Sequence, residues 1–258
     1  MDYLHKIEKV EGEDLLWNIP EQKLGIVNVI GGNLQNFRTP VKVTEFLATS
    51  YPFEKTNLVL PDTLKTKLPP LDNLVFLKST DSGSFADGEE LLSKMDQADF
   101  NLLIGDLSRN AITGKAVQSA CHLSAKPTLI TRNTVDIIAD GQAERILMNS
   151  NLMIMGSVVQ LQKLFKAVYY PKMLMPSQSL VQVAEALHKF TLSYPIGLIT
   201  LHDVQIIVAQ NGIVNVLPLK NTSYSPITIW DGMLASKIVA LNLYNPNNFL
   251  EATLVATK

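Results

Sequence analysis

Short apolar runs alternate with amphipathic helical stretches along most of this chain, and this alternation limits the possible folds more than any other feature. Residues 24–30 (Leu-Gly-Ile-Val-Asn-Val-Ile) form a mostly apolar run that is typical of a buried strand. Similar runs predict strands at residues 58–61, 74–77, 100–104, 127–131, 152–155 and 196–201. Between them, helical spacing predicts helices at residues 44–51, 87–95, 113–122, 134–138, 158–168 and 179–190. Strands that alternate with helices favour a mostly parallel sheet covered on both faces.

The pattern changes towards the C-terminus. Residues 205–210 and 213–218 are two apolar runs separated only by Asn211-Gly212, a pair that favours a two-residue hairpin turn. The last element that we expect is a helix that begins near Asp231. We predict a single three-layer α/β/α domain over residues 1–258, with a mostly parallel central sheet and an antiparallel hairpin near the C-terminus. Residues 1–23 are expected to be an N-terminal extension.

Composition and charge exclude several classes of protein. The net charge of −2 and the interspersed charged residues argue against a nucleic-acid partner. The single cysteine, Cys121, excludes an intramolecular disulfide framework and is compatible with a reducing cytoplasm. Apolar windows at residues 147–155 and 196–209 are too short or too interrupted to span a membrane, and residues 1–17 lack the apolar core of a signal peptide. The four histidines show no metal-ligand spacing, so we expect no protein metal centre.

Ligands of parallel α/β sheets bind beyond the carboxyl ends of the strands. The predicted strand ends carry Gly31-Gly32-Asn33, Gly105-Asp106 and Thr131-Arg132-Asn133, and Asp231 follows a loop from the last strand. The double glycine is equally well explained as a simple turn. Arg109 and Arg132 also fall at strand ends, and they would bind an anion if both faced one crevice.

Four blocks of sequence occur in the order found in a known group of proteins. They are residues 25–33 (Gly-Ile-Val-Asn-Val-Ile-Gly-Gly-Asn), 98–105 (Ala-Asp-Phe-Asn-Leu-Leu-Ile-Gly), 126–133 (Lys-Pro-Thr-Leu-Ile-Thr-Arg-Asn) and 231–238 (Asp-Gly-Met-Leu-Ala-Ser-Lys-Ile). In these blocks the chain resembles the ribokinase-like superfamily, and within it the ADP- or ATP-dependent NAD(P)H-hydrate dehydratases. The resemblance runs from about residue 24 to the end of the chain.

The resemblance implies a reaction and a set of site residues. ATP or ADP with Mg²⁺ would drive the removal of water from hydrated NADH or NADPH, and Asp231 would be the catalytic acid or base. The implied nucleotide-binding residues are Thr200, Thr228, Trp230 and Gly232. The implied substrate-binding residues are Gly31, Gly32, Asn33, Gly105 and Asn133. Members of the family commonly self-associate, so the resemblance also allows a homo-oligomer.

The chain departs from the family at several ligand-facing positions. The family's Gly-Pro-Gly-Leu-Gly turn is Gly-Asp-Leu-Ser-Arg at residues 105–109, and Thr131 and Asn133 replace two acids. The Gly-Thr-Gly-Asp anion hole is Thr-Ile-Trp-Asp at residues 228–231, where Cβ atoms obstruct the nest of N–H groups. The chain also ends one or two helices before the family usually does.

These departures leave three functional hypotheses open. The first is a divergent hydrate dehydratase, a hydro-lyase with weakened or lost activity. The second is a catalytically inactive ribokinase-like binding or assembly module, and the third is a small-molecule kinase. Erosion of several motifs at once favours a pseudoenzyme. In that case Asp231 is only a helix cap, a role that contributes roughly 0.5 to 2 kcal/mol.

Overall fold

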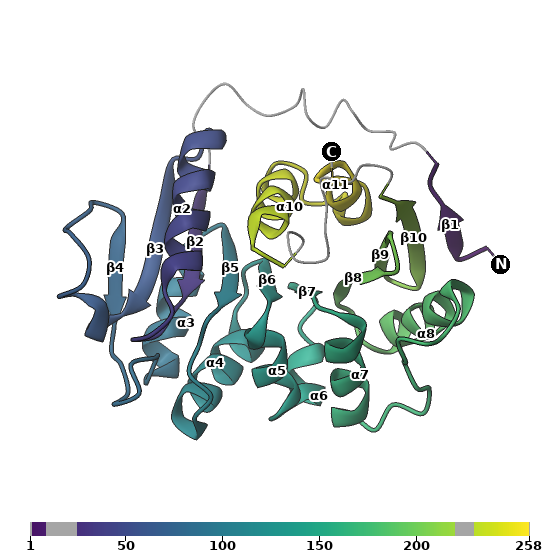
Figure 1. Ribbon diagram of the computed structural model, residues 1–258, viewed down its shortest axis with the longest axis horizontal. Helices are drawn as coiled ribbons and strands as arrows, with labels where there is room; N and C mark the ends of the chain where they lie inside the picture. The colour runs from purple at the N-terminus through teal and green to yellow at the C-terminus, as the bar shows by residue number, and fades with distance from the viewer. Residues whose placement is uncertain (1, 9–24, 220–229, 258) are drawn as a thin grey trace.

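The computed structural model describes residues 2–8, 25–219 and 230–257. Within these ranges, ten strands form one sheet in the order β1-β10-β9-β8-β7-β6-β5-β2-β3-β4 (Figure 1). The strands are β1 (Leu4–Lys6), β2 (Ile26–Gly31), β3 (Lys55–Pro61), β4 (Leu74–Leu77), β5 (Phe100–Gly105), β6 (Thr128–Thr131), β7 (Leu152–Met155), β8 (Gly197–His202), β9 (Gln205–Gln210) and β10 (Ile213–Pro218).

Helices join and cover these strands. They are α2 (Arg38–Ser50), the short 3-10 helix η1 (Asp62–Leu64), α3 (Gly88–Asp96), α4 (Ala111–Leu123), α5 (Asn133–Ala139), α6 (Ala143–Leu147), α7 (Val158–Ala167), α8 (Leu180–Ser193), α10 (Met233–Tyr244) and α11 (Phe249–Val255). None of the helices in the described part of the chain combines the length and the apolar character that crossing a membrane requires.

The sheet is parallel except at one strand. Among the described strands, only β9 runs against its neighbours, because two-residue turns at residues 203–204 and 211–212 reverse the chain before and after it. Asn211 and Gly212 have φ angles of 50° and 76°, which a primed hairpin turn requires. Both the mostly parallel sheet and the antiparallel hairpin are therefore confirmed.

Two helical layers enclose the sheet, as Figure 1 shows. Helices α2, α10 and α11 pack on one face, and their core includes Val43, Ile238 and Phe249. Helices α3 to α8 pack on the other face, around residues such as Leu91 and Phe190. The three-layer α/β/α prediction is confirmed. Almost every residue of α10 from Leu234 to Asn242 is buried, because the helix is enclosed by the sheet, α2 and α11.

A row of buried asparagines sets the register of three central strands. Asn28 of β2 lies opposite Asn57 of β3 and Asn101 of β5. The Asn28 amide nitrogen donates to Asn101 Oδ1 at 3.1 Å, and Asn57 donates to Asn28 Oδ1 at 2.9 Å. A slip of one residue would turn these amides to the opposite face of the sheet and break the bonds. The row therefore also fixes where the carboxyl ends of the three strands stand relative to one another.

Two expectations about local structure were wrong, and the predicted N-terminal extension contains a strand. The helix predicted at residues 44–51 begins six residues earlier, at Arg38, because Pro40 lies in the first turn, where a missing N–H breaks no helical bond. The helix near Asp231 is not the last element, since α11 follows it. Inside the predicted extension, Leu4–Lys6 forms β1, which pairs in parallel with β10.

Candidate functional site

The candidate site lies where the carboxyl ends of β2, β5 and β6 meet the start of α10. The first two of these strand ends touch through backbone alone. A Cβ atom on Gly31 would lie 2.5 Å from the carbonyl oxygen of Gly105, a distance that no side chain tolerates. The Gly32 N–H donates to the same oxygen at 2.9 Å. The predicted substrate residues Gly31, Gly32 and Gly105 are therefore brought together at one point.

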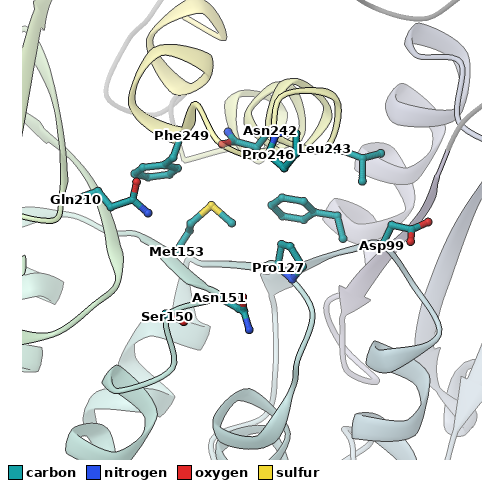
Figure 2. Close-up of a pocket in the computed structure, with 11 residues that line it drawn as sticks. Asp99, Pro127, Ser150, Asn151, Met153, Gln210, Asn242, Leu243, Pro246 and Phe249 are labelled. Atoms are coloured by element: carbon teal, nitrogen blue, oxygen red, sulfur yellow. The ribbon is translucent and has the colours of Figure 1, made fainter.

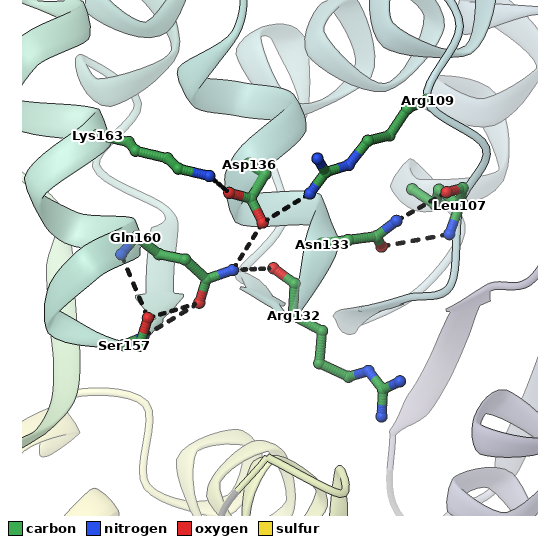
Figure 3. A network of polar contacts seen from close by, with 8 residues as sticks. All are labelled: Leu107, Arg109, Arg132, Asn133, Asp136, Ser157, Gln160 and Lys163. Atoms are coloured by element: carbon green, nitrogen blue, oxygen red, sulfur yellow. Dashed lines mark hydrogen bonds and ion pairs between the residues drawn. The ribbon is translucent and has the colours of Figure 1, made fainter.

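The two predicted substrate asparagines hold the loop that follows β5. Asn33 Nδ2 donates to the carbonyl of Asp106 at 2.6 Å. Asn133 Nδ2 donates to the carbonyl of Leu107 at 2.7 Å, and its Oδ1 accepts from the Leu107 N–H at 3.2 Å (Figure 3). Both amides are thus engaged with backbone in this structure, and they shape the loop on which Asp106 is carried.

Arg132, at the end of β6, connects this loop to α10. Its guanidinium donates to Asp106 Oδ1 at 2.6 Å and to the carbonyl of Trp230 at 3.3 Å. Its backbone has φ 57° and ψ −137°, a conformation that L-residues avoid and that costs about 1 to 3 kcal/mol. Gln160 Nε2 holds the strained peptide by donating to the Arg132 carbonyl at 2.8 Å. Backbone strain that surrounding bonds maintain is a frequent feature of functional sites.

Asp231 lies beside the same contact, directly before the helix. Its Oδ1 accepts from the Met233 N–H at 2.8 Å, which stabilises the helix start as a cap. Its Oδ2 lies 3.8 Å from Lys42 Nζ of α2, and its side chain is 32% exposed. One carboxylate oxygen is thus structural, while the other faces a loosely placed cation.

Gly232 allows the chain to turn into α10. Its φ of 98° suits glycine, and a Cβ there would lie 2.8 Å from a methyl carbon of Val43. Trp230 is half-buried and packs beside the core under α10. Thr228, the remaining predicted nucleotide residue of this segment, lies outside the described residues, as does Ile229.

Thr200 lies apart from α10. It is buried in β8, and neighbouring Ile199 packs in the core beneath α10 and α11. Because side chains alternate along a strand, the Thr200 side chain is directed to the opposite face, towards α3 to α8. Its hydroxyl makes no hydrogen bond with any residue that the structure describes.

A second polar cluster borders the site on the α5 and α7 side. Asp136 contacts Lys163, accepts from Gln160 Nε2 at 2.9 Å and lies 3.2 Å from Arg109. Burial alone would raise the pKa of this carboxyl group, but the bonds from Lys163 and Gln160 and the charges of Lys163 and Arg109 together lower it below the usual 3.8. Asp136 is therefore a charged anchor between two helices.

The two strand-end arginines do not face one crevice. Figure 3 shows Arg109 reaching Asp136, whereas the guanidinium of Arg132 extends in the opposite direction. Each has its own carboxylate partner, Asp136 for Arg109 and Asp106 for Arg132. The expectation that they share an anion is not supported by this geometry.

Sequence reasoning missed Lys42 and the roles of Asp106, Asp136 and Gln160. Lys42 was missed because α2 was expected to begin after it. The position of Asp106 directly after a strand-ending glycine was a usable signal, since such positions line the ligand crevice. Among the described residues, no group of three or more His, Cys, Asp or Glu side chains is placed to hold a metal ion.

Comparisons with known proteins agree with this architecture. No protein-family model and no curated protein sequence matches the chain. A solved ribokinase-like superfamily protein from Enterococcus faecalis is similar, with a TM-score of 0.67 and 15% identity over 99% of this chain and 85% of that one. The ADP/ATP-dependent NAD(P)H-hydrate dehydratase from Bacillus subtilis, crystallised with ATP and Mg²⁺, has a TM-score of 0.60 and 11% identity over 97% of this chain and 86% of that one. Adenosine kinase from Anopheles gambiae has a TM-score of 0.56 and 9% identity over 98% of this chain and 89% of that one.

The chain is thus an α/β protein whose candidate site lies at the carboxyl ends of a mostly parallel sheet. More particularly, it has the ribokinase-like fold, which these solved structures share with it over nearly its whole length.

Proposed function

We propose that this protein is a divergent NAD(P)H-hydrate dehydratase that binds ATP or ADP with Mg²⁺ at the carboxyl ends of β5 and β6. The observation that carries the proposal is the meeting of Arg132 and Asp231 at the start of α10. The guanidinium of Arg132 bonds to the carbonyl of Trp230, the residue directly before Asp231. A permanent cation and a carboxylate therefore both lie at the start of α10, and transfer of a phosphoryl group requires both kinds of group.

Arg132 would replace the glycine nest that this sequence lacks. Where several backbone N–H groups would hold a phosphate, a guanidinium presents planar donors that match phosphate oxygens in pairs. Arg132 is 27% exposed, so a nucleotide phosphate can reach it by competing with Asp106 for its donors. The strained backbone is consistent with a side chain that is held in place for binding.

Asp231 would move the proton. In the first step the hydroxyl oxygen of the hydrated ring attacks the terminal phosphorus of the nucleotide, and its proton passes to Asp231. The bond between that phosphorus and its bridging oxygen breaks, so ATP leaves as ADP, or ADP leaves as AMP. Oδ2 is the oxygen that we assign, because Oδ1 already accepts the Met233 N–H. In the second step inorganic phosphate leaves with the electrons of the C–O bond, a neighbouring C–H proton is lost and the ring double bond is restored.

The residues present fit a magnesium ion that is held largely by the nucleotide. Mg²⁺ commonly binds substrate phosphates, waters and only one or two carboxylates, and the site offers the carboxylate of Asp106. When bound, the cation would neutralise charge on the phosphate oxygens.

A second candidate function is a non-catalytic ribokinase-like module. It is favoured by the internal pairing of both acids, because Asp106 bonds to Arg132 and Asp231 caps α10. In this alternative the charged groups stabilise the loops and no nucleotide is needed. The geometry favours the first candidate because a cap alone does not require the strained arginine beside it.

Calorimetric titration with Mg-ATP and Mg-ADP separates the two candidates. We expect binding to the unchanged protein, a loss of at least tenfold in affinity for Arg132→Ala, and near-unchanged affinity for Asp231→Asn. Turnover of hydrated NADH, followed by the appearance of NADH, should fall by about 10²-fold or more in Asp231→Asn. The exposed control Arg145→Ala, on α6, should change neither quantity. No heat with either nucleotide from a folded sample would instead support the non-catalytic module.

A further inference from the structure

A cavity of about 150 Å³ opens at the amino-terminal ends of the central strands, whereas the candidate site lies at their carboxyl ends. Phe100 begins β5, Pro127 directly precedes β6 and Asn151 directly precedes β7, so their positions mark the amino ends of these strands. The carboxyl end of β5 lies five residues further on, roughly 16 Å away at the rise of a strand. The cavity is therefore separate from the site around Asp231, and nothing below depends on the proposed function.

The walls of the cavity are mostly apolar and include two aromatic rings. Figure 2 shows Phe249, the first residue of α11, and Pro246, from the turn before α11, facing Met153 of β7 and Pro127. Phe100 completes the lining with a second ring. Gly197 leaves room for the Phe249 ring, because a Cβ atom at this position would lie 2.6 Å from the ring. An apolar cavity of about this volume accommodates a benzene ring, and thioether sulfur packs well against aromatic groups.

The polar groups of the cavity offer both acceptors and donors. Asn242 Nδ2 donates to the Ile238 carbonyl at 2.8 Å, and Asn151 Nδ2 donates to the Ala125 carbonyl at 3.2 Å. Each amide therefore keeps its oxygen and a second N–H for another partner. The Gln210 side chain makes no hydrogen bond within the described part of the chain, so both its donor and its acceptor are available.

The charge of the lining residues favours a ligand of positive charge. Asp99 is exposed at the mouth, and among the described residues that line the cavity it is the only charged one. Its Oδ2 accepts from the Ile26 N–H at 2.8 Å. Aromatic faces also attract cations. Phosphates, carboxylates and nucleotides are disfavoured for the same reason.

From these features we infer that the cavity is a binding site for a small aromatic cation, a molecule of one ring that carries N–H donors. The ring would lie between Phe249, Phe100 and Met153. The cationic N–H group would face Asp99 and the amide oxygens of Asn151 and Asn242. Benzamidine, benzamide and benzoate are suitable probes, because they share one shape and differ in charge.

Methyl-methionine NMR tests the inference at the cavity itself. The Met153 methyl resonance is assigned by its loss in Met153→Leu, and the exposed Met173 methyl, in the loop after α7, is the internal control. We expect benzamidine to shift the Met153 resonance saturably, with a dissociation constant on the order of 1 mM, and to leave Met173 unmoved. Benzamide should bind about two- to fivefold more weakly, and benzoate should not bind.

Two charge variants complete the design. Asp99→Asn should abolish the preference for benzamidine over benzamide, whereas Asp72→Asn, an exposed change before β4, should preserve it. The inference is overturned if no probe shifts Met153, if benzoate binds as well as benzamidine, or if the preference survives in Asp99→Asn.

Discussion

The guanidinium of Arg132 lies 2.6 Å from the carboxylate of Asp106, and both residues have positive φ angles, 57° and 58°. They come from the ends of neighbouring strands, β6 and β5, so two strained backbones are held against each other by one ion pair. The pair connects the loop after β5 to the start of α10, where Asp231 lies. We take this contact as the centre of the candidate site.

Replacing Arg132 by glycine should destabilise the fold less than replacing it by alanine. Both variants lose the ion pair, but only glycine relieves the unfavourable backbone, so Arg132→Gly should be more stable by about 1 kcal/mol. Urea unfolding of the two variants measures the difference. Equal stability, or a more stable alanine variant, would show that the backbone is not strained.

Asp231 should have separable structural and chemical roles. An asparagine oxygen can still accept the Met233 N–H, so Asp231→Asn should unfold close to the temperature of the unchanged protein. Asp231→Ala loses the cap and should cost about 1 kcal/mol. Thermal unfolding compares the three proteins. If alanine and asparagine are equally destabilising, charge rather than capping determines the stability at this position.

Two glycines should respond to alanine in opposite directions. At Gly31 the new Cβ would meet the Gly105 carbonyl at 2.5 Å, so the change should cost about 2 to 3 kcal/mol. At Gly114, inside α4, the atom nearest to the new Cβ is Gln118 Nε2 at 4.0 Å. Alanine should therefore raise the free energy of unfolding by about 0.5 to 1 kcal/mol through its helix propensity. Urea unfolding measures both. A destabilised Gly114→Ala would contradict the open space at that position.

Asp136 should make stability depend on acid pH. Its pKa is lower in the folded protein than the usual 3.8, so its contribution is present above that value and is lost as the pH falls through the folded pKa. Asp136→Asn should cost about 2 kcal/mol at pH 7 by weakening the bonds from Lys163 and Gln160. The difference from the unchanged protein should shrink on acidification below about pH 4. A constant difference from pH 7 to pH 3 would refute this role.

The order of strands and helices could be read from the sequence because it depends on local periodicity. The run at residues 24–30 and the Asn211-Gly212 pair each encode their element in a few neighbouring residues. Pro40 shows that local sequence patterns do not always give the bounds of an element. The predicted helix began after Pro40, whereas α2 includes Pro40 in its first turn, where the missing N–H breaks no helical hydrogen bond.

The sequence by itself therefore determined the layered architecture, the hairpin and the acidic residue at the start of α10. The tertiary structure alone decided what surrounds that residue. Arg132 meets Asp106 across 26 positions of chain and Trp230 across 98, and these contacts depend on which strands become neighbours and in what register. The face of β8 that carries Thr200 and the partner strand of β1 were decided in the same way. Periodicity is a property of adjacent residues, whereas a site is assembled from strand ends that only the complete sheet brings together.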